Sequence, residues 1–494
     1  PSIDADSATL VGAGNVVTAD IRDISVDVNL AKSPGETPLL KPSAVNLTTF
    51  NGGSLSVPTG DTLNPAILLT SDDQILRATA DDVTLAISDF VYIHGGGVAF
   101  EKGPDRNVTL ANGTVKEVSV LTIGAANVDA FAGVGPYFVD SNNNGTIDGS
   151  DTPSGDAIGL AIAGLDFGFA LLQGSDLTDI PNDAQGAVDY PAKYYALTAT
   201  ADLATLVGVE DVVTATLRNI TIDVNVAKSS TETPLLKPSV VNFAALAGGG
   251  LLIPTGDTAN PSVLLNTSSG IILASVERAT LNVAGTISLD GSIAVSKQAS
   301  QWVTAAAGGG PRHVDVLTIG GENLYGFAGV DGPYRTDTNG DGVINGSDTP
   351  NTNATGLSLE GLTFGMALMK DVIGPNKYVG LKASTDTLQL VGVDGVTAVA
   401  RNVDVEFNEV SPQPPVVAAR LDVIDFASFA GGKLAVETGG SNTVDLDFNE
   451  RLLAASGDLT VNVSNLVTID GVFDFQLSPS KIFAYVDGTG SVGA

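Results

Sequence analysis

The chain repeats itself, and this repetition limits its possible folds more than any other feature. The segments LVG at 10–12, VDVN at 26–29 and TPLLKPS at 37–43 return 196 residues later as LVG, IDVN and TPLLKPS. At the same offset, PTGDT at 58–62 and VLTIG at 120–124 recur unchanged. A fixed period of this length is typical of repeat arrays, in which one structural unit is used several times.

A third, more diverged copy begins at Lys377-Tyr378, which matches Lys193-Tyr194, and carries VETGG at 436–440 where the other copies have PTGDT. We therefore divide the chain into three predicted modules. The first spans 1–192 and lacks most of its opening strand, the second spans 193–376, and the third spans 377–494 and stops before its acidic loop. We expect the natural protein to continue beyond both ends.

Hydrophobic residues alternate with polar ones inside each module, which predicts long β-strands with one buried face. From Leu281 to Val295 the odd positions are apolar or glycine, which indicates one long strand or two strands in a hairpin. Asp290-Gly291 allows either a hairpin turn or a glycine kink there. Helical spacing is confined to a short turn near 423–430. The fold class expected is all-β: tandem, antiparallel, sandwich-like modules with long strands and only short helices.

An acidic twelve-residue loop in the second module carries the clearest chemical pattern. Oxygen-bearing residues occupy loop positions 1, 3 and 5, a glycine occupies position 6, and an aspartate closes the loop at position 12. Position 7 offers its backbone carbonyl to a cation, and the glycine permits the sharp bend that an EF-hand-type loop requires. The predicted calcium ligands are Asp337, Asn339, Asp341, Val343, Asn345 and Asp348.

The first module contains a second copy of this loop. Its predicted calcium ligands are Asp140, Asn142, Asn144, Thr146, Asp148 and Asp151. Both loops close with Asp where an EF-hand has Glu, and no helical pattern precedes them. In this they resemble the calcium loops of dockerins and of calcium-stabilised bacterial surface modules, with an expected Kd of roughly 10⁻⁵ to 10⁻³ M. The alternative is a metal-free turn, since such turns favour the same residues.

Composition narrows the class of partner and the compartment. The chain has 56 acidic and 23 basic residues, a net charge of −33, which disfavours nucleic acid and anionic membranes as partners. It has no cysteine, as is common in large bacterial exoproteins. No apolar run is long enough to span a bilayer, so membrane insertion is not expected. These features indicate a secreted protein that is extracellular or bound to the cell surface.

Several phrases resemble repeat modules of very large bacterial secreted proteins of the adhesin or surface-layer type. They are YALTA at 195–199, LVGV at 206–209, FAGV at 327–330 and GLTFGMAL at 361–368. The likeness extends over nearly the whole chain. It implies a location outside the cell and a repetitive architecture, and it implies no defined activity.

The residues that most enzymes use are scarce here. The chain has two histidines, and neither is repeated, since His94 matches Asp290 and His313 matches Glu117 in the other copy. Trp302 is the single tryptophan. We therefore expect no enzyme. The first hypothesis is a calcium-stabilised structural protein that self-associates into a filament, fibre or layer. The second is an adhesin module that binds a glycan or a neighbouring cell, and the third, an extracellular hydrolase, is the least favoured.

Overall fold

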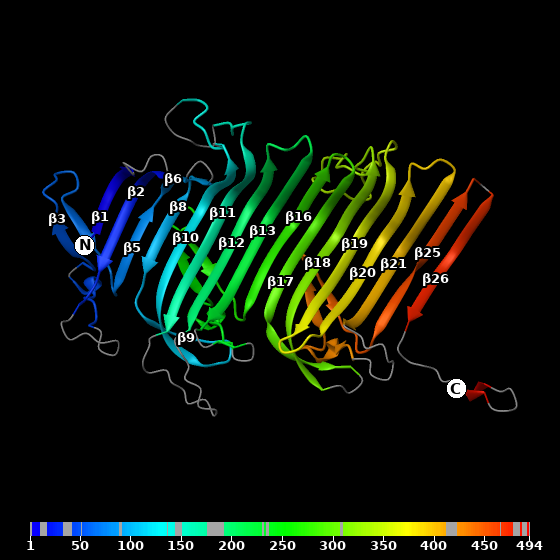
Figure 1. Cartoon of the computed structure of the whole chain (residues 1–494). Helices are drawn as coiled ribbons and strands as arrows, with labels where there is room; N and C mark the ends of the chain where they lie inside the picture. The colour runs from blue at the N-terminus through cyan, green and yellow to red at the C-terminus, as the bar shows by residue number, and fades with distance from the viewer. Residues whose placement is uncertain are drawn as a thin grey trace. The chain divides into compact units, whose positions relative to one another are not determined.

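The computed structural model describes most of the chain (Figure 1). Apart from three-residue 3₁₀ turns, the regular structure of the described residues is β-strand, and their strand pairs are antiparallel. This confirms the all-β prediction. The described residues are 2–9, 17–32, 42–50, 52–87, 91–135, 137–143, 151–174, 192–229, 232–233, 237–306, 310–411, 422–464, 466–477, 485–486 and 492–493.

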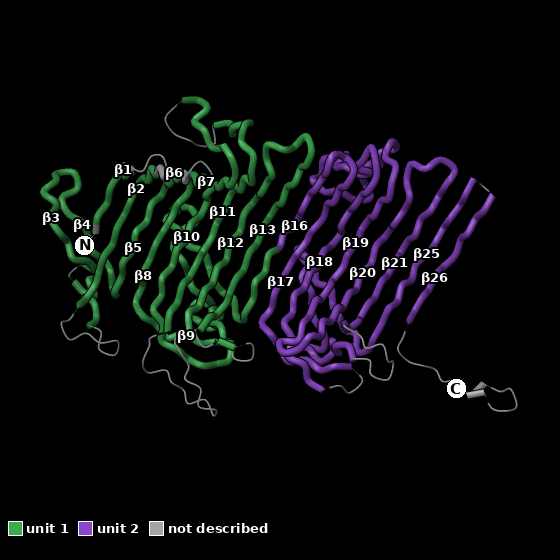
Figure 2. The backbone as a smooth tube through the Cα atoms, viewed as in Figure 1, with its two compact units in different colours: residues 1–274 green, residues 275–494 purple. Residues whose placement is uncertain are grey.

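The chain forms two compact units, residues 1–274 and 275–494 (Figure 2). The three sequence modules are out of phase with these units, because the unit boundary divides the second module. Compactness and repetition are separate criteria, so the module boundaries stay a prediction.

Unit 1 is built on long antiparallel strands joined in sequence. β10 pairs with β11, β11 with β12 and β12 with β13, while β1 pairs with β2. The shorter β7, β8 and β9 all pair with β10. The strands are β1 Ser2–Thr9, β2 Val17–Asn29, β3 Leu55–Pro58, β4 Ala66–Leu69, β5 Ile75–Ala80, β6 Asp82–Ile87, β7 Val91–His94, β8 Gly97–Lys102, β9 Arg106–Thr109, β10 Val115–Val134, β11 Ile158–Gly174, β12 Lys193–Val207, β13 Val213–Lys228, β14 Leu251–Pro254 and β15 Ser262–Leu265.

Unit 2 repeats this plan. Its strands pair in the series β17, β18, β19, β20, β21, β25 and β26. The strands are β16 Ile271–Val283, which begins in unit 1, β17 Ile287–Ala305, β18 Pro311–Val330, β19 Thr355–Asp371, β20 Lys377–Val391, β21 Val396–Ser411, β22 Ile424–Asp425, β23 Leu434–Glu437, β24 Thr443–Leu446, β25 Leu452–Val463, β26 Val467–Leu477, β27 Tyr485–Val486 and β28 Val492–Gly493.

A compact segment that we call an arm occurs three times among the described residues. Each arm consists of a 3₁₀ turn followed by a two-stranded hairpin. Arm 1 spans 45–69 with the turn η1 Leu47–Thr49, arm 2 spans 241–265 with η2 Phe243–Ala245, and arm 3 spans 424–446 with η4 Phe426–Ser428. The turn in arm 3 confirms the short helical turn that was expected near 423–430.

Arms 2 and 3 form the main cores of the two units. Arm 2 contacts β8 to β12, and its Phe243 and Ile253 are fully buried among apolar residues of β9 to β12. Arm 3 contacts β17 to β20 in the same way through Phe426 and Val436. The arms therefore supply a second layer over one face of the long strands, which the alternation along those strands leaves apolar.

Arms 2 and 3 each sit on a pair of glycines that face each other across two strands. Gly124 of β10 is in register with Gly168 of β11, and Gly320 of β18 with Gly365 of β19. A Cβ on Gly124 would lie 2.2 Å from the carbonyl oxygen of Pro254, and one on Gly320 would lie 2.2 Å from that of Glu437. Glycine is needed at these positions because the arm backbone approaches the sheet too closely for any side chain.

The alternating stretch from 281 to 295 consists of two strands. The chain turns between β16 and β17 at 284–286, where Ala284 and Gly285 have positive φ. β17 then runs through Asp290-Gly291, with a register shift against β18 between Asp290 and Ser292. The glycine kink was thus the correct alternative at this point, and the hairpin turn at Asp290-Gly291 was wrong, because the turn lies four to six residues earlier.

Candidate functional site

The acidic loop of the second module connects β18 to β19 and is anchored by Arg335. The Arg335 guanidinium donates 2.5 Å to the backbone oxygen of Asp348 and 3.0 Å to Oε2 of Glu360, which lies on β19. The Arg335 and Glu360 side chains are 14% and 11% exposed, and Arg335 also lies 5.7 Å from the Tyr334 ring centroid. This mostly buried ion pair joins the closing residue of the loop to the sheet.

The first and last aspartates of the loop hold it together. Oδ1 of Asp337 accepts from the N–H of Gly340 at 2.7 Å, and Oδ2 accepts from the N–H of Gly342 at 2.8 Å. Asp348 is 2% exposed and accepts from the N–H of Thr338 at 2.9 Å and of Asn345 at 2.8 Å. The hydrogen bond from the N–H of Asn345 is the main cause that lowers the pKa of Asp348 below its usual value. Burial acts in the opposite direction, and the N–H of Thr338 lowers the pKa further.

The remaining predicted ligands form local turns along the loop. Asn339 accepts from the N–H of Asp341 at 2.9 Å, and Asp341 accepts from the N–H of Val343 at 2.8 Å. Asn345 accepts from the N–H of Ser347 at 2.7 Å. The six residues predicted from the spacing therefore lie in one compact loop, and the side-chain oxygens of the five Asp and Asn residues accept from backbone amides.

The residue types of this loop fit a hard cation. Asp337, Asp341 and Asp348 place three carboxylates in twelve residues that contain no Lys or Arg. A carboxylate has about four lone-pair sites, so an oxygen that accepts one amide N–H can still bind Ca²⁺. Among the described residues, however, no three His, Cys, Asp or Glu side chains come together as a metal-binding group. The amide bonds would stabilise a metal-free turn as well, so the loop geometry is compatible with both interpretations.

The loop of the first module repeats part of this geometry. Oδ1 of Asp151 accepts from the N–H of Ser141 at 2.9 Å and of Asn142 at 3.3 Å, as Asp348 does in the second loop. Asp140 is also described, whereas the predicted ligands Asn144, Thr146 and Asp148 lie outside the described residues.

The anchor of the first loop is different. The position of Arg335 is taken by Phe138 and that of Glu360 by Ala163. Phe138 packs 5.1 Å from the ring of Tyr137 and 5.8 Å from that of His94. An aromatic cluster therefore replaces the ion pair.

The two histidines occupy separate structural positions. Nδ1 of His94 lies 3.2 Å from the Thr84 hydroxyl. In the repeat, Asp290 takes the place of His94 and accepts from Thr280 at 2.6 Å. His94 thus fills a structural position that a carboxylate fills in the other copy.

His313 belongs to an aromatic pair whose other member is exposed. It is stacked on Trp302, with ring centroids 4.8 Å apart and an interplanar angle of 15°. Trp302 is 64% exposed, so its ring is accessible on the surface of unit 2. An exposed aromatic ring is a feature that a sugar could stack on.

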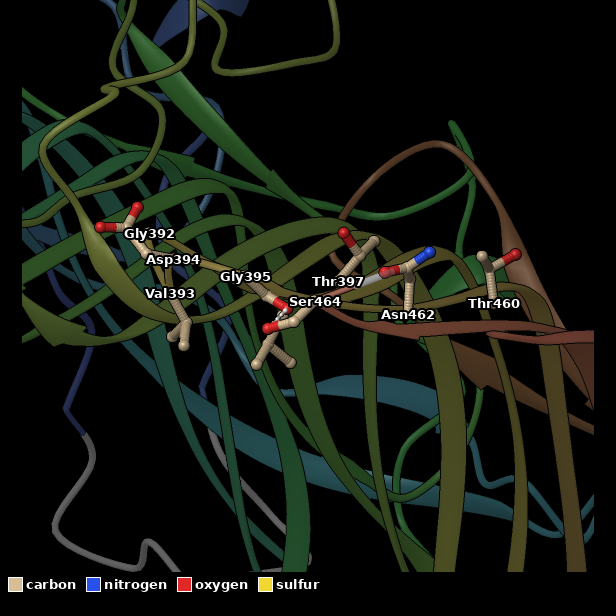
Figure 3. Close-up of a pocket in the computed structure, with 9 residues that line it drawn as sticks. Gly392, Val393, Asp394, Gly395, Thr397, Thr460, Asn462 and Ser464 are labelled. Atoms are coloured by element: carbon tan, nitrogen blue, oxygen red, sulfur yellow. Dashed lines mark hydrogen bonds between the residues drawn. The ribbon is translucent and has the colours of Figure 1, made fainter. Parts of the chain in front are cut away.

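An open groove of about 660 Å³ lies beside the turn between β20 and β21 (Figure 3). The N–H of Ser464 donates to the Gly395 oxygen at 2.6 Å and closes one side. Hydroxyl, amide and carboxylate groups face the groove, and no aromatic ring lines it. Its lining residues are Gly392, Val393, Asp394, Gly395, Val396, Thr397, Thr460, Asn462 and Ser464. The sequence patterns did not single out this groove, because its residues come from two segments about 70 positions apart.

No family model, curated protein or solved structure matches the chain. Within the described part of the chain, no helix is long and apolar enough to cross a membrane.

Proposed function

We propose that the chain is a calcium-stabilised structural repeat protein that is exported and forms part of a cell-surface filament, fibre or layer. The observation that carries this proposal is the reuse of one construction in both units. An arm seated on a cross-strand glycine pair occurs as Ile253 over Gly124 and Gly168, and as Val436 over Gly320 and Gly365. Repetition of a packing unit is what an extended scaffold requires, whereas a catalytic site is needed only once.

The acidic loops supply the proposed calcium dependence. Without a cation, three carboxylates repel one another within the loop at 337–348, and a bound ion removes this repulsion. At a free calcium concentration about 100 times the Kd, binding would add about 2.7 kcal/mol of stability per site. The ligands proposed are the two loop sets, and Arg335 would keep the second loop docked on the sheet.

Exposed apolar residues on β26 support self-association. Leu477 is 60% exposed, Ile469 54% and Phe475 53%, and their positions in the alternation place all three on one face of the strand. An apolar strand face of this kind favours contact with another protein surface.

Calorimetry and electron microscopy with and without EDTA test the proposal. Chelation is expected to lower the melting temperature and to disperse assemblies, and calcium but not magnesium should restore both. Unchanged melting together with unchanged assembly after thorough chelation would exclude calcium stabilisation.

A second candidate is an adhesin module that binds a glycan or a neighbouring cell. The exposed Trp302 stacked on His313 is the observation that favours it. Binding to a glycan array that is lost in Trp302→Ala would support this function, and identical signals from both proteins would oppose it. An extracellular hydrolase remains the third and least favoured hypothesis.

A further inference from the structure

Arm 1 matches arm 2 in sequence, but apolar side chains that are buried in arms 2 and 3 are exposed in arm 1. It shares with arm 2 the opening Val-Asn, the Gly-Gly pair, the Pro-Thr-Gly-Asp-Thr turn and the closing Leu-Leu. Its hairpin has the same register, with Leu55 opposite Leu69 as Leu251 is opposite Leu265. The first arm is therefore a complete copy of the element that forms the core of each unit.

The exposed fractions of matching residues differ sharply between the arms. Val57 is 41% exposed, whereas its counterparts Ile253 and Val436 are 0% exposed. Val45 is 59% exposed, whereas its counterparts Val241 and Ile424 are also 0% exposed.

The turn threonine of each arm follows the same pattern. Thr59 is exposed, and its counterparts Thr255 and Thr438 are 0% exposed. Arm 1 thus presents to solvent the face that the other two arms bury.

Arms 2 and 3 pack on the cross-strand glycine pairs described above, and we call each such pair a glycine seat. Beneath Ile253, a Cβ on Gly168 would lie 3.0 Å from Cδ1 of Ile253, and Gly124 faces the backbone of the same hairpin. That glycine pair is taken by arm 2. A partner for arm 1 therefore fits best if it brings an antiparallel strand pair with two glycines in register. A Cβ at the Gly124 position would meet the hairpin backbone, and a Cβ at the Gly168 position would crowd the hairpin side chains.

The edge strand beside arm 1 points to the same partner. β1 pairs with β2, whereas its counterparts lie between two strands: β12 between β11 and β13, and β20 between β19 and β21. A strand of the β11 type placed against β1 would reproduce the pairing that β12 makes. It would also bring the glycine pair beneath arm 1.

We propose that arm 1 and β1 together form a docking surface for a strand pair of the β10–β11 type, supplied by another copy of this repeat. The incoming pair would seat Val57 over its two glycines and would pair its second strand with β1. This inference does not depend on calcium, so it can fail while the proposed function stands.

A graft tests whether arm 1 can dock. In the full chain, the sequence of residues 45–69 replaces residues 241–265. Val57 then falls at position 253, and it is replaced there by cysteine. The natural chain has no cysteine, so the maleimide labelling of this thiol is unambiguous. We expect labelling within about threefold of that of the protected Ile253→Cys chain. Labelling as fast as that of an exposed thiol would overturn the proposal, since the glycine seat is present in this variant.

An extension tests the partner itself. Residues 115–196, which contain β10 and β11, are fused in phase before Pro1, and Val57→Cys is labelled. We expect the extension to slow labelling at least tenfold, and Gly124→Val in the added copy to restore the fast rate. Leu63→Cys, 87% exposed at the hairpin tip, should label equally with and without the extension.

Two outcomes would contradict the proposal. The first is an unchanged labelling rate in an extended chain whose added copy resists proteolysis. The second is protection of Val57→Cys that rises with protein concentration in the chain without the extension. Arms 2 and 3 already occupy the two glycine pairs of that chain, so a different surface would then be covering arm 1.

Discussion

Replacement of Gly320 by alanine should loosen arm 3 while leaving the rest of unit 2 intact. The added methyl would lie 2.2 Å from the Glu437 carbonyl oxygen and 3.1 Å from Cγ1 of Val436. Both neighbours belong to the buried hairpin, so the arm must move away from the sheet. Overpacking of this kind costs about 1–3 kcal/mol. Because each 1.4 kcal/mol is a factor of ten, the open state of the arm should become about 5- to 150-fold more populated.

Hydrogen–deuterium exchange of the peptide that covers 434–446 measures this opening directly. Gly326→Ala is the matched control, since Gly326 lies in the same strand and its added Cβ would meet Leu359 at an ordinary 3.7 Å. We expect faster exchange in Gly320→Ala only, with the arm 2 peptide at 251–265 unchanged. Equal exchange in the wild-type protein and Gly320→Ala would refute the glycine-seat argument.

Three further predictions concern the loop and the core of unit 2. Arg335→Ala leaves Glu360 buried without its cation and should destabilise unit 2 by about 3–5 kcal/mol in urea unfolding, whereas Phe138→Ala, at the matching position of unit 1, should leave unit 2 unchanged. Burial, and after it the nearby Asp371, raise the pKa of Tyr378 in the folded protein, so the unfolded chain loses this proton at a lower pH than the folded one. The free energy of unfolding should therefore fall above about pH 10, where the unfolded phenol ionises. Tyr378→Phe should reduce this fall in unfolding curves measured from pH 8 to 11. Asp337→Asn should weaken calcium binding in titration calorimetry at least tenfold, and equal affinity in the variant would show that Asp337 is not a ligand.

Much of this architecture could be predicted from the sequence because its signals are local or repeated. Alternation of apolar residues predicts long strands, and β10 buries Val118 and Val120 as that pattern requires. The repeat offset also predicts that Lys193 and Lys377 begin equivalent strands, as β12 and β20 do.

The arms and their seats could not be predicted in the same way. Gly320 reads locally as an interruption in a strand, and its role depends on Val436, more than 100 residues later. The turn at 284–286 is hard to recognise because its one typical turn residue, Gly285, fits the alternation of apolar positions, whereas Asp290-Gly291 is a typical turn pair. The loop ligands at 337–348 were placed in one compact turn by spacing alone, but spacing does not say whether a metal binds there.

The most direct test of calcium stabilisation is hydrogen–deuterium exchange of the loop peptide 335–351, compared in calcium, in magnesium and after chelation. Calcium stabilisation predicts that the amides of Gly340, Gly342 and Val343 exchange slowly in calcium and rapidly in the other two solutions. Identical exchange in all three would mean that the aspartates hold a metal-free turn, and the calcium-stabilised scaffold would have to be abandoned.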